Sequence, residues 1–452
     1  MTWRRKLKIR NRCHRLTLAG ALLGGLPLAV FAGDTPAEAW SLHGQYTMVK
    51  QRHGSFRSPY VGDNSLLPSE GTQTTMDATL YLGRRLWEGA EVFVNPELDQ
   101  GFGLSGTLGA AGFASGEAYK VGHHSPYGRL QRAFLRQTLR TSDTPDAEVT
   151  SGPNTLGGSL PLDNLRLTLG KFSVVDLFDV NSYAHDPRSD FLNWAVIDAG
   201  AFDYAADSWG FSLGGAAEWT LGDWTWRAGL FSTSHEPNSP RLDHSFAQHQ
   251  SVFEVEYRHQ WHGHPGRLKV LAFSTRARLG AYEEAVALSR GRAANPAPAD
   301  TSQVRRNTSK QGYAFNLEQD VAEGVGLFAR YSRNDGKTEA DDFTDINRSF
   351  SAGLSIQGSG WGEPGHSLGL ALAQNALSDA ARRYFAAGGL GLLIGDGRLP
   401  QYGPEQIAEA YYAVKVMPGL AISLDLQRLV HPAYNTQRGP VTVLGARLHA
   451  EF

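Results

Sequence analysis

The chain has 452 residues, of which 51 are glycine, 10% are aromatic and 19% are charged, and its formal net charge is -2. Because the chain has no net positive charge, it lacks the attraction on which binding to nucleic acid or to an anionic lipid surface depends, and we expect no nucleic acid partner. The length fits several ordinary domains or one large all-β barrel, so it does not set the domain count.

The N-terminal segment has the features of an export signal. A basic stretch, MTWRRKLKIRNRCHR, precedes a short apolar run, LTLAGALLGGLPLAVFA, which ends in small residues at Val30 and Ala32. We predict a signal peptide over residues 1–32 with cleavage after Ala32, and cleavage after Ala39 is the alternative. The one cysteine, Cys13, lies in this segment. We therefore expect a mature protein without disulfides, thiolate ligands or thiol nucleophiles.

From about residue 41 to the C-terminus, apolar and polar residues alternate, which is the pattern of β-strands with one apolar and one polar face. In TMDATLYLGRRL the two faces are Met76, Ala78, Leu80 and Leu82, and Asp77, Thr79, Tyr81 and Gly83. No later stretch has the roughly 18 unbroken apolar residues of a transmembrane helix. Counting the alternating runs predicts sixteen strands, near residues 41–50, 74–86, 90–96, 130–140, 165–171, 209–220, 223–232, 250–260, 267–276, 311–319, 325–333, 348–357, 366–374, 408–416, 420–429 and 441–452.

The links between these strands alternate between short turns and long segments. The short turns are rich in Gly and Pro: WEGA, LGD, WHGHPG, AEG, GSGWGEPG and MPG. The long links are residues 51–73, 97–129, 172–208, 233–249, 277–310, 334–347, 375–407 and 430–440. Residues 141–164 take the place of a short turn but are long, which indicates either an insertion at that end or a miscounted strand.

This rhythm is typical of a transmembrane β-barrel with short turns at one end and long loops at the other. We therefore predict an all-β fold in which residues 40–452 form a single antiparallel transmembrane barrel of about 16 strands, with long loops folded inward. Aromatic residues near strand ends, including Trp87, Trp219 and Trp261, fit the girdles at the two membrane interfaces. The alternative is a soluble secreted all-β protein, whose apolar faces form a core and whose charged faces meet bulk water.

The last predicted strand is amphipathic up to the final residue. One face consists of Leu444, Ala446, Leu448, Ala450 and Phe452. An aromatic residue at the end of such a strand resembles the signal that the outer-membrane assembly machinery reads. We therefore expect this machinery, through Phe452, and the lipids of the outer membrane to be partners of the chain.

Patterns that would indicate catalysis or metal binding are weak. The segment DVNSYAHDPRSDFLNW, residues 179–194, is rich in carboxylates but lacks the ligand order and the central glycine of a calcium loop. No G-x-S-x-G motif precedes a predicted helix, and the Gly-rich stretch GFGLSGTLGAAGFASG lacks the lysine and the helix of a phosphate loop. We predict no enzyme, no metal and no cofactor, and interpret residues 179–194 as an ordered loop whose polar side chains satisfy its own turns.

A wide barrel would leave a water-filled lumen, and loops that fold inward would narrow it. Charged and aromatic groups at the constriction would then select the solute. Sugars suit both kinds of group, since hydroxyls pair with charged side chains and sugar ring faces lie on aromatic rings. Residues 97–136 and 172–210 are rich in both, so we expect the constriction there.

Five long stretches carry a further signal: NPELDQGFGLSGTLGAAGFASGEAYKVG (95–122), PYGRLQRAFLRQTL (126–139), LTLGKFSVVDLFDVNSYAHDPRSDFLNWAVIDAGAFDYAAD (167–207), GDGRLPQYGPEQIAEAYY (395–412) and HPAYNTQRGPVTVLGARLHAEF (431–452). These stretches resemble the carbohydrate-selective outer-membrane porins of the OprB family. The resemblance implies a sixteen-stranded porin in the outer membrane of a Gram-negative bacterium, through which sugars, above all glucose-like monosaccharides, diffuse passively. Residues 277–310 depart from the family pattern.

The same resemblance implies a constriction lined by charged residues of the inward loops and the barrel wall. By position in the matching stretches, the residues expected to contact the sugar are Glu97, Asp99, Glu117, Lys120, Arg129, Arg132 and Arg136. Each has a plainer interpretation, in which Arg132 and Arg136 only solvate the lumen wall and Asp99 caps a turn. Two other functions stay open: a barrel that anchors an enzyme or adhesin, and a porin for other small solutes.

Overall fold

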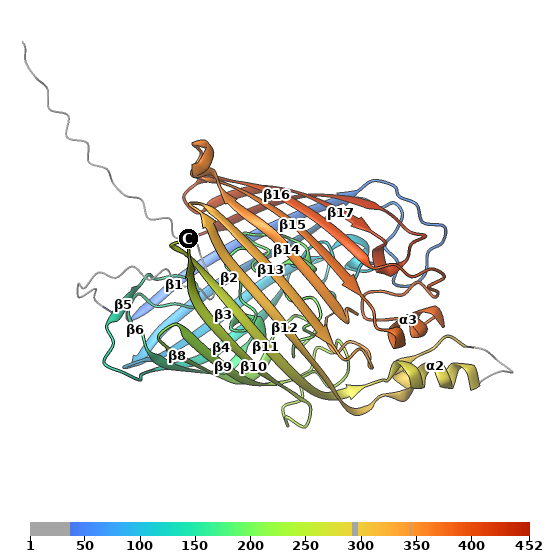
Figure 1. Ribbon diagram of the computed structural model, residues 1–452, viewed down its shortest axis with the longest axis horizontal. Coiled ribbons are helices and arrows are strands. Elements are labelled where there is room, and N and C mark those ends of the chain that lie inside the picture. Colours follow the sequence, from blue (N-terminus) through green and yellow to red (C-terminus); the bar gives the residue numbers. More distant parts are fainter. Residues whose placement is uncertain (1–36, 292–296, 344) are drawn as a thin grey trace, which may run out of the picture.

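The computed structural model describes residues 37–291, 297–343 and 345–452. Sixteen antiparallel strands close into a barrel (Figure 1). They are β1 (Trp40–His53), β2 (Gln73–Trp87), β3 (Ala90–Gly101), β4 (Tyr127–Arg140), β7 (Asn164–Phe172), β8 (Ser212–Leu221), β9 (Trp224–Ser232), β10 (His249–Trp261), β11 (His264–Leu279), β12 (Arg306–Ala322), β13 (Val325–Asn334), β14 (Arg348–Gln357), β15 (His366–Ala376), β16 (Glu405–Met417), β17 (Leu420–Val430) and β18 (Val441–Glu451). The predicted sixteen-stranded barrel is confirmed. The predicted signal peptide and Cys13 lie outside the described residues.

The two terminal strands close the barrel. β1 pairs with β18 in a ladder that runs from Gln45 opposite Glu451 to His53 opposite Val443. Closure leaves no free sheet edge. In hydrocarbon this is required, because a backbone N–H or C=O group without a partner costs several kcal/mol there.

Near the long loops, strands extend further than the alternation predicts. β11 continues to Leu279 and β12 begins at Arg306, whereas the predicted ranges are 267–276 and 311–319. Arg306 forms an exposed ion pair with Glu284. Beyond the membrane edge both faces of a strand meet polar surroundings, so the alternation disappears from the sequence while the pairing continues.

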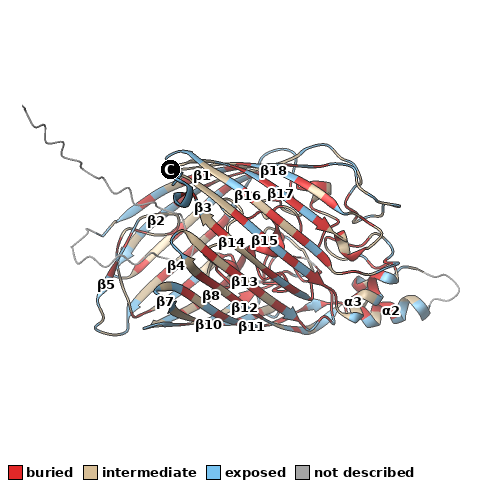
Figure 2. Cartoon of the chain, turned by 45° about the horizontal axis from the view of Figure 1, so that its top comes forward, coloured by how far each residue is buried: buried red, intermediate tan, exposed pale blue. Residues whose placement is uncertain are grey.

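The long link between β4 and β7 contains a separate hairpin of two strands, β5 (Asp146–Val149) and β6 (Gly158–Pro161). It lies at the end of the barrel with the short turns, opposite the end that carries helices α2 (Tyr282–Gly291) and α3 (Asp379–Ala386) (Figure 1, Figure 2). Of the two interpretations of this link, the insertion is correct.

The tip of this hairpin folds back into the barrel. The Asn95 amide on the inner wall donates a hydrogen bond to the Asn154 side chain (2.9 Å), and Arg136 donates one to the Asn154 carbonyl (3.0 Å). Leu156 is buried. The hairpin therefore fills part of the short-turn end of the lumen.

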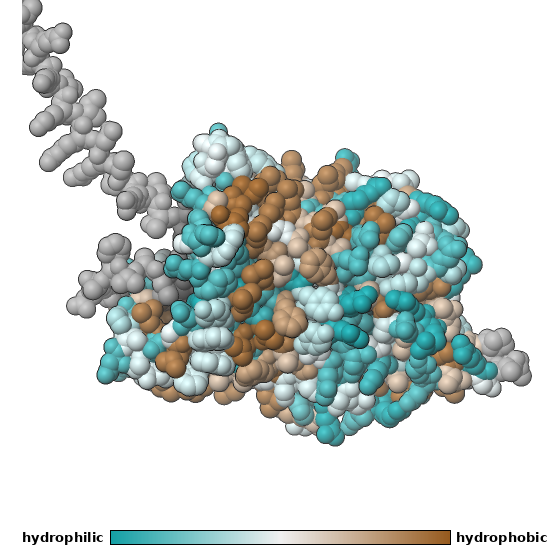
Figure 3. Space-filling model, viewed as in Figure 1, coloured by the Kyte–Doolittle hydropathy of each residue, from teal (hydrophilic) through white to brown (hydrophobic). Residues whose placement is uncertain are grey.

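The outer face of the wall is apolar and exposed. Leu169, Leu372 and Leu424 are 66%, 64% and 64% exposed, although all three lie within strands. Hydrophobic side chains gather over the strands, whereas hydrophilic ones dominate the end that carries α2 and α3 (Figure 3). A soluble protein would bury such a surface, so the soluble alternative is wrong and the strands span a membrane.

The hydrophobic core lies inside the barrel and is built mainly by loops. Phe191, Trp194 and Phe343 of two different loops belong to one buried cluster. The short helices of these and other links are η1 (Leu104–Gly106), η2 (Val174–Asp176), α1 (Trp194–Ile197), η3 (Thr301–Val304), η4 (Gly358–Trp361) and η5 (Pro432–Tyr434). Within the described residues, none of the helices has the length and apolar character needed to cross a membrane.

The orientation of the wall predicts a depth-dependent effect of charge. Leu372 points outward near the middle of β15, whereas Met417 lies at the short-turn end of β16. We expect Leu372→Arg to lower the free energy of unfolding by about 2–4 kcal/mol, and Met417→Arg, as the control, by about 0–1 kcal/mol. Denaturant unfolding in lipid vesicles measures both. Equal effects of the two substitutions would contradict the placement of the wall in the bilayer.

Candidate functional site

The loop of residues 173–211, between β7 and β8, is fixed to the inner wall by a buried ion pair. Arg330 on β13 contacts Asp179 at 3.2 Å, and both side chains are 1% exposed. Asn316 on β12 donates to the same carboxylate at 2.8 Å, and the Ala199 amide donates at 2.7 Å. These partners compensate the desolvation of the Asp179 carboxylate. They hold Asp179 and the backbone at Ala199 against β12 and β13.

The same loop reaches the opposite wall. The Leu192 amide donates to Glu409 on β16 at 2.5 Å, and the Asn193 side chain donates to Gln427 on β17 at 3.0 Å. On β18, Arg447 donates to the carbonyls of Pro187 (2.7 Å), Ser189 (2.8 Å) and Asp190 (2.7 Å). Because its contacts run from β12 and β13 to β16–β18, the loop of residues 173–211 crosses the lumen, and we call it the crossing loop.

Residues 179–194 satisfy their own turns, as the sequence interpretation predicts. Asp190 accepts hydrogen bonds from the amides of His185 (3.1 Å) and Asp186 (3.2 Å), and Asp186 accepts one from the Arg188 amide (2.9 Å). The described part of the chain contains no group of three or more histidine and acidic residues that could hold a metal ion. The polar residues of this segment thus build a loop.

Aromatic contacts join the inward loops to each other. The Trp194 ring stacks between Phe113 of the β3–β4 loop (5.0 Å between centroids) and Phe343 of the β13–β14 loop (4.7 Å). The Tyr183 ring lies on Gly326 of β13, where a Cβ atom would be 2.1 Å from the ring. Glycine is needed at that wall position because any side chain would displace the loop.

Two of the candidate acids, Glu97 and Glu117, contact one arginine of this loop, together with Asp77. Arg188 contacts Asp77 on β2 at 3.0 Å, Glu97 on β3 at 3.3 Å and Glu117 of the β3–β4 loop at 3.5 Å. Asp99 is buried on the same strand face as Glu97. Burial raises the pKa of Glu117 well above its usual range. Glu117 is therefore protonated at neutral pH, and the net negative charge of the acid cluster is smaller than its number of carboxyl groups.

Two candidate arginines on β4 face the two ends of the loop that crosses the lumen, Arg132 its start and Arg129 its end. Arg129 contacts Asp207 at 3.4 Å and lies over the Trp209 ring at 3.2 Å. Arg132 donates two hydrogen bonds, of 2.7 and 2.6 Å, to Asp176. The first pair is partly accessible, since the Arg129 side chain is 21% exposed, whereas Arg132 is 8% exposed.

Lys120 lies apart from the other candidates, between loops on the long-loop side. Its Nζ atom is 4.9 Å from the centroid of the Phe343 ring. Burial lowers the pKa of Lys120 and raises the pKa of the neighbouring Asp342. Burial also raises the pKa of Asp345 to about 6. These groups are therefore poised to change charge close to neutral pH.

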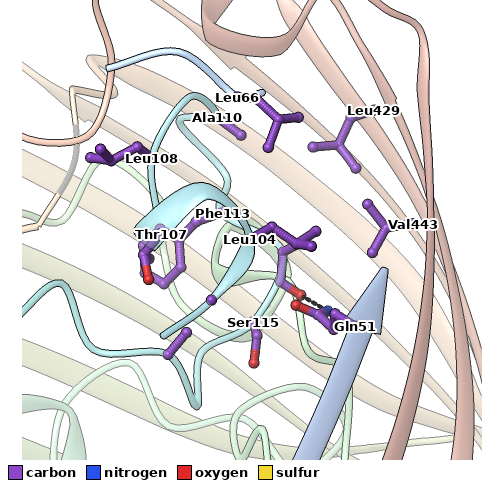
Figure 4. A pocket seen from close by; sticks show the side chains of 13 residues that line it. Gln51, Leu66, Leu104, Thr107, Leu108, Ala110, Phe113, Ser115, Leu429 and Val443 are labelled. Carbon is purple, nitrogen blue, oxygen red and sulfur yellow. Dashed lines mark hydrogen bonds between the residues drawn. The ribbon is translucent and has the colours of Figure 1, made fainter. Parts of the chain in front are cut away.

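Arg136 lies deeper, in a chamber of about 890 Å³ at the short-turn end. A second cavity, of about 20 Å³, lies between the β3–β4 loop and the wall, and its apolar lining includes Leu104, Phe113 and Leu429 (Figure 4). Gln51 closes one side of it by donating to the Ala114 carbonyl at 2.7 Å (Figure 4). A cavity of this size has room for about one water molecule, so it is too small for a sugar, whereas the chamber is large enough.

The structure thus divides the seven candidates into groups. Glu97, Asp99 and Glu117 lie in the acid cluster around Arg188. Arg129 and Arg132 lie on β4 beside the crossing loop. Arg136, also on β4, lies in the chamber at the short-turn end, and Lys120 lies between loops on the long-loop side. Sequence reasoning assigned no solute contact to the following neighbours: Asp77, Lys171, Asp176, Arg188, Asp207, Trp209 and Phe211. Asp77 could have been found from its place on the polar face of β2, whereas the loop residues have no periodicity to reveal them.

Comparison with known proteins identifies the family. The model of the carbohydrate-selective porin, OprB family, matches residues 63–452. The chain belongs to this family. It is a sugar porin of the Gram-negative outer membrane.

Solved structures support the fold. The high pH structure of OprB from Pseudomonas putida has a TM-score of 0.67 and 16% sequence identity, with 92% of this chain and 94% of that chain covered. The outer-membrane channel DcaP of Acinetobacter baumannii has a TM-score of 0.50 and 10% identity, with 94% and 100% covered. No curated protein sequence matches the chain significantly.

The buried ion pair of the crossing loop yields one prediction. Asp179→Ala leaves the Arg330 charge buried without its partner, so we expect the free energy of unfolding to fall by about 3–5 kcal/mol. Adding Arg330→Met removes the orphaned charge and should restore part of this loss. Denaturant unfolding in detergent measures both variants. An Asp179→Ala protein as stable as the wild type would contradict the anchoring role.

The group around Lys120 predicts a change of ion selectivity with pH. Between about pH 5 and about pH 9, Lys120 loses its positive charge while Asp342 and Asp345 gain negative charge, because the pKa of the lysine is lowered and those of the acids are raised. All three changes make the long-loop side of the barrel more negative, so we expect cation selectivity to rise. Reversal potentials in a KCl gradient measure this, and Lys120→Met should reduce the change. A pH-independent reversal potential would refute the prediction.

Proposed function

We propose that this porin selects glucose-like monosaccharides at a constriction between β4 and the crossing loop. The observation that carries the proposal is the cluster of Arg129, Lys171, Asp207 and Trp209. Lys171 contacts Asp207 at 3.3 Å, and the Lys171 and Arg129 side chains are 23% and 21% exposed. Hydrogen-bonding charges beside an aromatic ring are the groups that a sugar ring and its hydroxyls complement.

The other candidates take different parts in this proposal. Glu97 and Asp99 are 2% exposed, too little for contact with a passing sugar, so they position Arg188 and the loop above it. Arg132 is held by Asp176 and continues the wall below Arg129. Burial therefore separates the residues that touch solute from those that shape the opening.

We also propose two partners in the membrane: the outer-membrane lipids and the outer-membrane assembly machinery. The exposed leucines of the wall support contact with outer-membrane lipids, and the exposed Phe452 after β18 supports recognition by the assembly machinery. We further propose that residues 1–32 are a signal peptide and that the barrel has no enzymatic activity of its own.

The constriction can be tested by sugar block of ion current in planar bilayers. We expect glucose to reduce the current, and Arg129→Ala or Trp209→Ala to weaken the block about fivefold, since each removes an interaction of about 1 kcal/mol. Arg140→Ala is the control, because Arg140 pairs with Asp146 near the hairpin. Block by amino acids of similar size as strong as block by glucose would instead indicate a porin for other small solutes.

A further inference from the structure

The chamber at the short-turn end has a distinct set of charged groups. Its volume is about 890 Å³, and it is bounded by the inner faces of β2–β4 and β7–β11, by the start of the crossing loop at Asp176 and Leu177, and by the hairpin. Phe134 and Phe172 form part of its lining. A chamber of this size is large enough for a monosaccharide.

Most arginines that line the chamber are neutralised by a carboxylate. The pairs are Arg85 with Glu91 (3.3 Å), Arg140 with Asp146, Arg227 with Glu218 (2.9 Å), Arg258 with Glu256 (3.1 Å) and Arg267 with Glu318 (3.2 Å). Arg136 and Arg166 differ, since no carboxylate of the described residues lies within 4.0 Å of either guanidinium. Two positive charges therefore face the chamber without a direct counter-ion from the chain.

These two arginines lie close together on neighbouring strands. In the pairing of β4 with β7, Thr138 is opposite Arg166 and Arg136 is opposite Thr168, so Arg136 and Arg166 are diagonal neighbours on the inner face. Thr168 is 3% exposed and its hydroxyl has no hydrogen-bond partner among the described residues. Two guanidiniums and a hydroxyl thus form one cluster of hydrogen-bond donors.

An acceptor lies beside this cluster. Glu218 on β8 is opposite Arg166 and binds Arg227 through Oε2 at 2.9 Å, whereas its Oε1 atom has no hydrogen-bond partner among the described residues. A ligand with several anionic groups would place one of them near the Glu218 carboxylate and be repelled by it. A ligand with one acidic group and several hydroxyls would satisfy both the arginines and this carboxylate.

We propose that the chamber is a second solute site, specific for acidic monosaccharides that carry one carboxylate, such as hexuronates. The sugar carboxylate lies between Arg136 and Arg166, a ring hydroxyl donates to Glu218, and the ring packs on the Phe134 or Phe172 side of the chamber. This proposal rests on the proposed function in one respect, namely that sugars are the solutes of this porin. It extends the solutes of this porin beyond neutral hexoses.

Galacturonate and galactose form a matched pair of probes, because they differ in a carboxylate in place of a hydroxymethyl group. In planar bilayers at low ionic strength, we expect galacturonate to block current through the wild-type protein at concentrations about tenfold lower than galactose. Arg166→Gln should abolish this difference while leaving block by galactose unchanged, and Arg166→Lys should retain part of it. Arg267→Gln is the control, because Arg267 lines the same chamber but is paired with Glu318.

The outcomes separate this site from the constriction. Equal block by the two sugars in the wild type, or an equal loss in Arg166→Gln and Arg267→Gln, would overturn the acidic-sugar site. Block by acetate as strong as by galacturonate would overturn it too, because the arginines would then bind any small carboxylate. If glucose and galactose fail to block while galacturonate does, the proposed function fails and the acidic-sugar site stands.

Discussion

The structure depends on one constraint: in hydrocarbon, every backbone N–H and C=O group needs a partner within the protein. The pairing of β1 with β18 meets this requirement by closing the sheet. Compared with a soluble globular protein, the barrel places its residues the other way round: leucines such as Leu372 face outward, and charged groups line the inside. A lumen lined by charges cannot be filled by a simple apolar core, so the interior is organised by loops that bring hydrogen-bond partners to the wall.

The crossing loop shows how these partners are supplied. Asp179 meets Arg330 on one wall, while Glu409 and Arg447 on the opposite wall bind backbone groups of the same loop. Each wall charge would be costly to bury alone, and each loop carbonyl or amide would be equally costly without a partner. Wall and loop therefore stabilise each other.

The sequence predicts the parts of the molecule that repeat with period two. Sixteen strands and the alternation of turns and loops follow from it, because lipid and lumen impose opposite polarity on successive residues. The hairpin of β5 and β6 was missed because strands of four residues, away from the membrane, carry no such alternation. The loop residues Arg188 and Trp209 could not be assigned partners, since their contacts with Asp77 and Arg129 join strands and loops far apart in the chain. The family resemblance pointed to Glu97 and Arg129 alike, and their different burial, on which the proposed roles rest, cannot be predicted from the sequence.

The three arginines of β4 show why residue type alone does not define selectivity. Arg129 is paired with Asp207 and Arg132 with Asp176, whereas Arg136 has only a backbone carbonyl of the hairpin. The positive charge left without a paired carboxylate is therefore found at Arg136, although the same residue type occurs at all three positions. The carboxylates that pair with Arg129 and Arg132 belong to the crossing loop, so the loop sets the electrostatics of this part of the wall. A change in that loop can then alter which sugars pass while every wall arginine is kept.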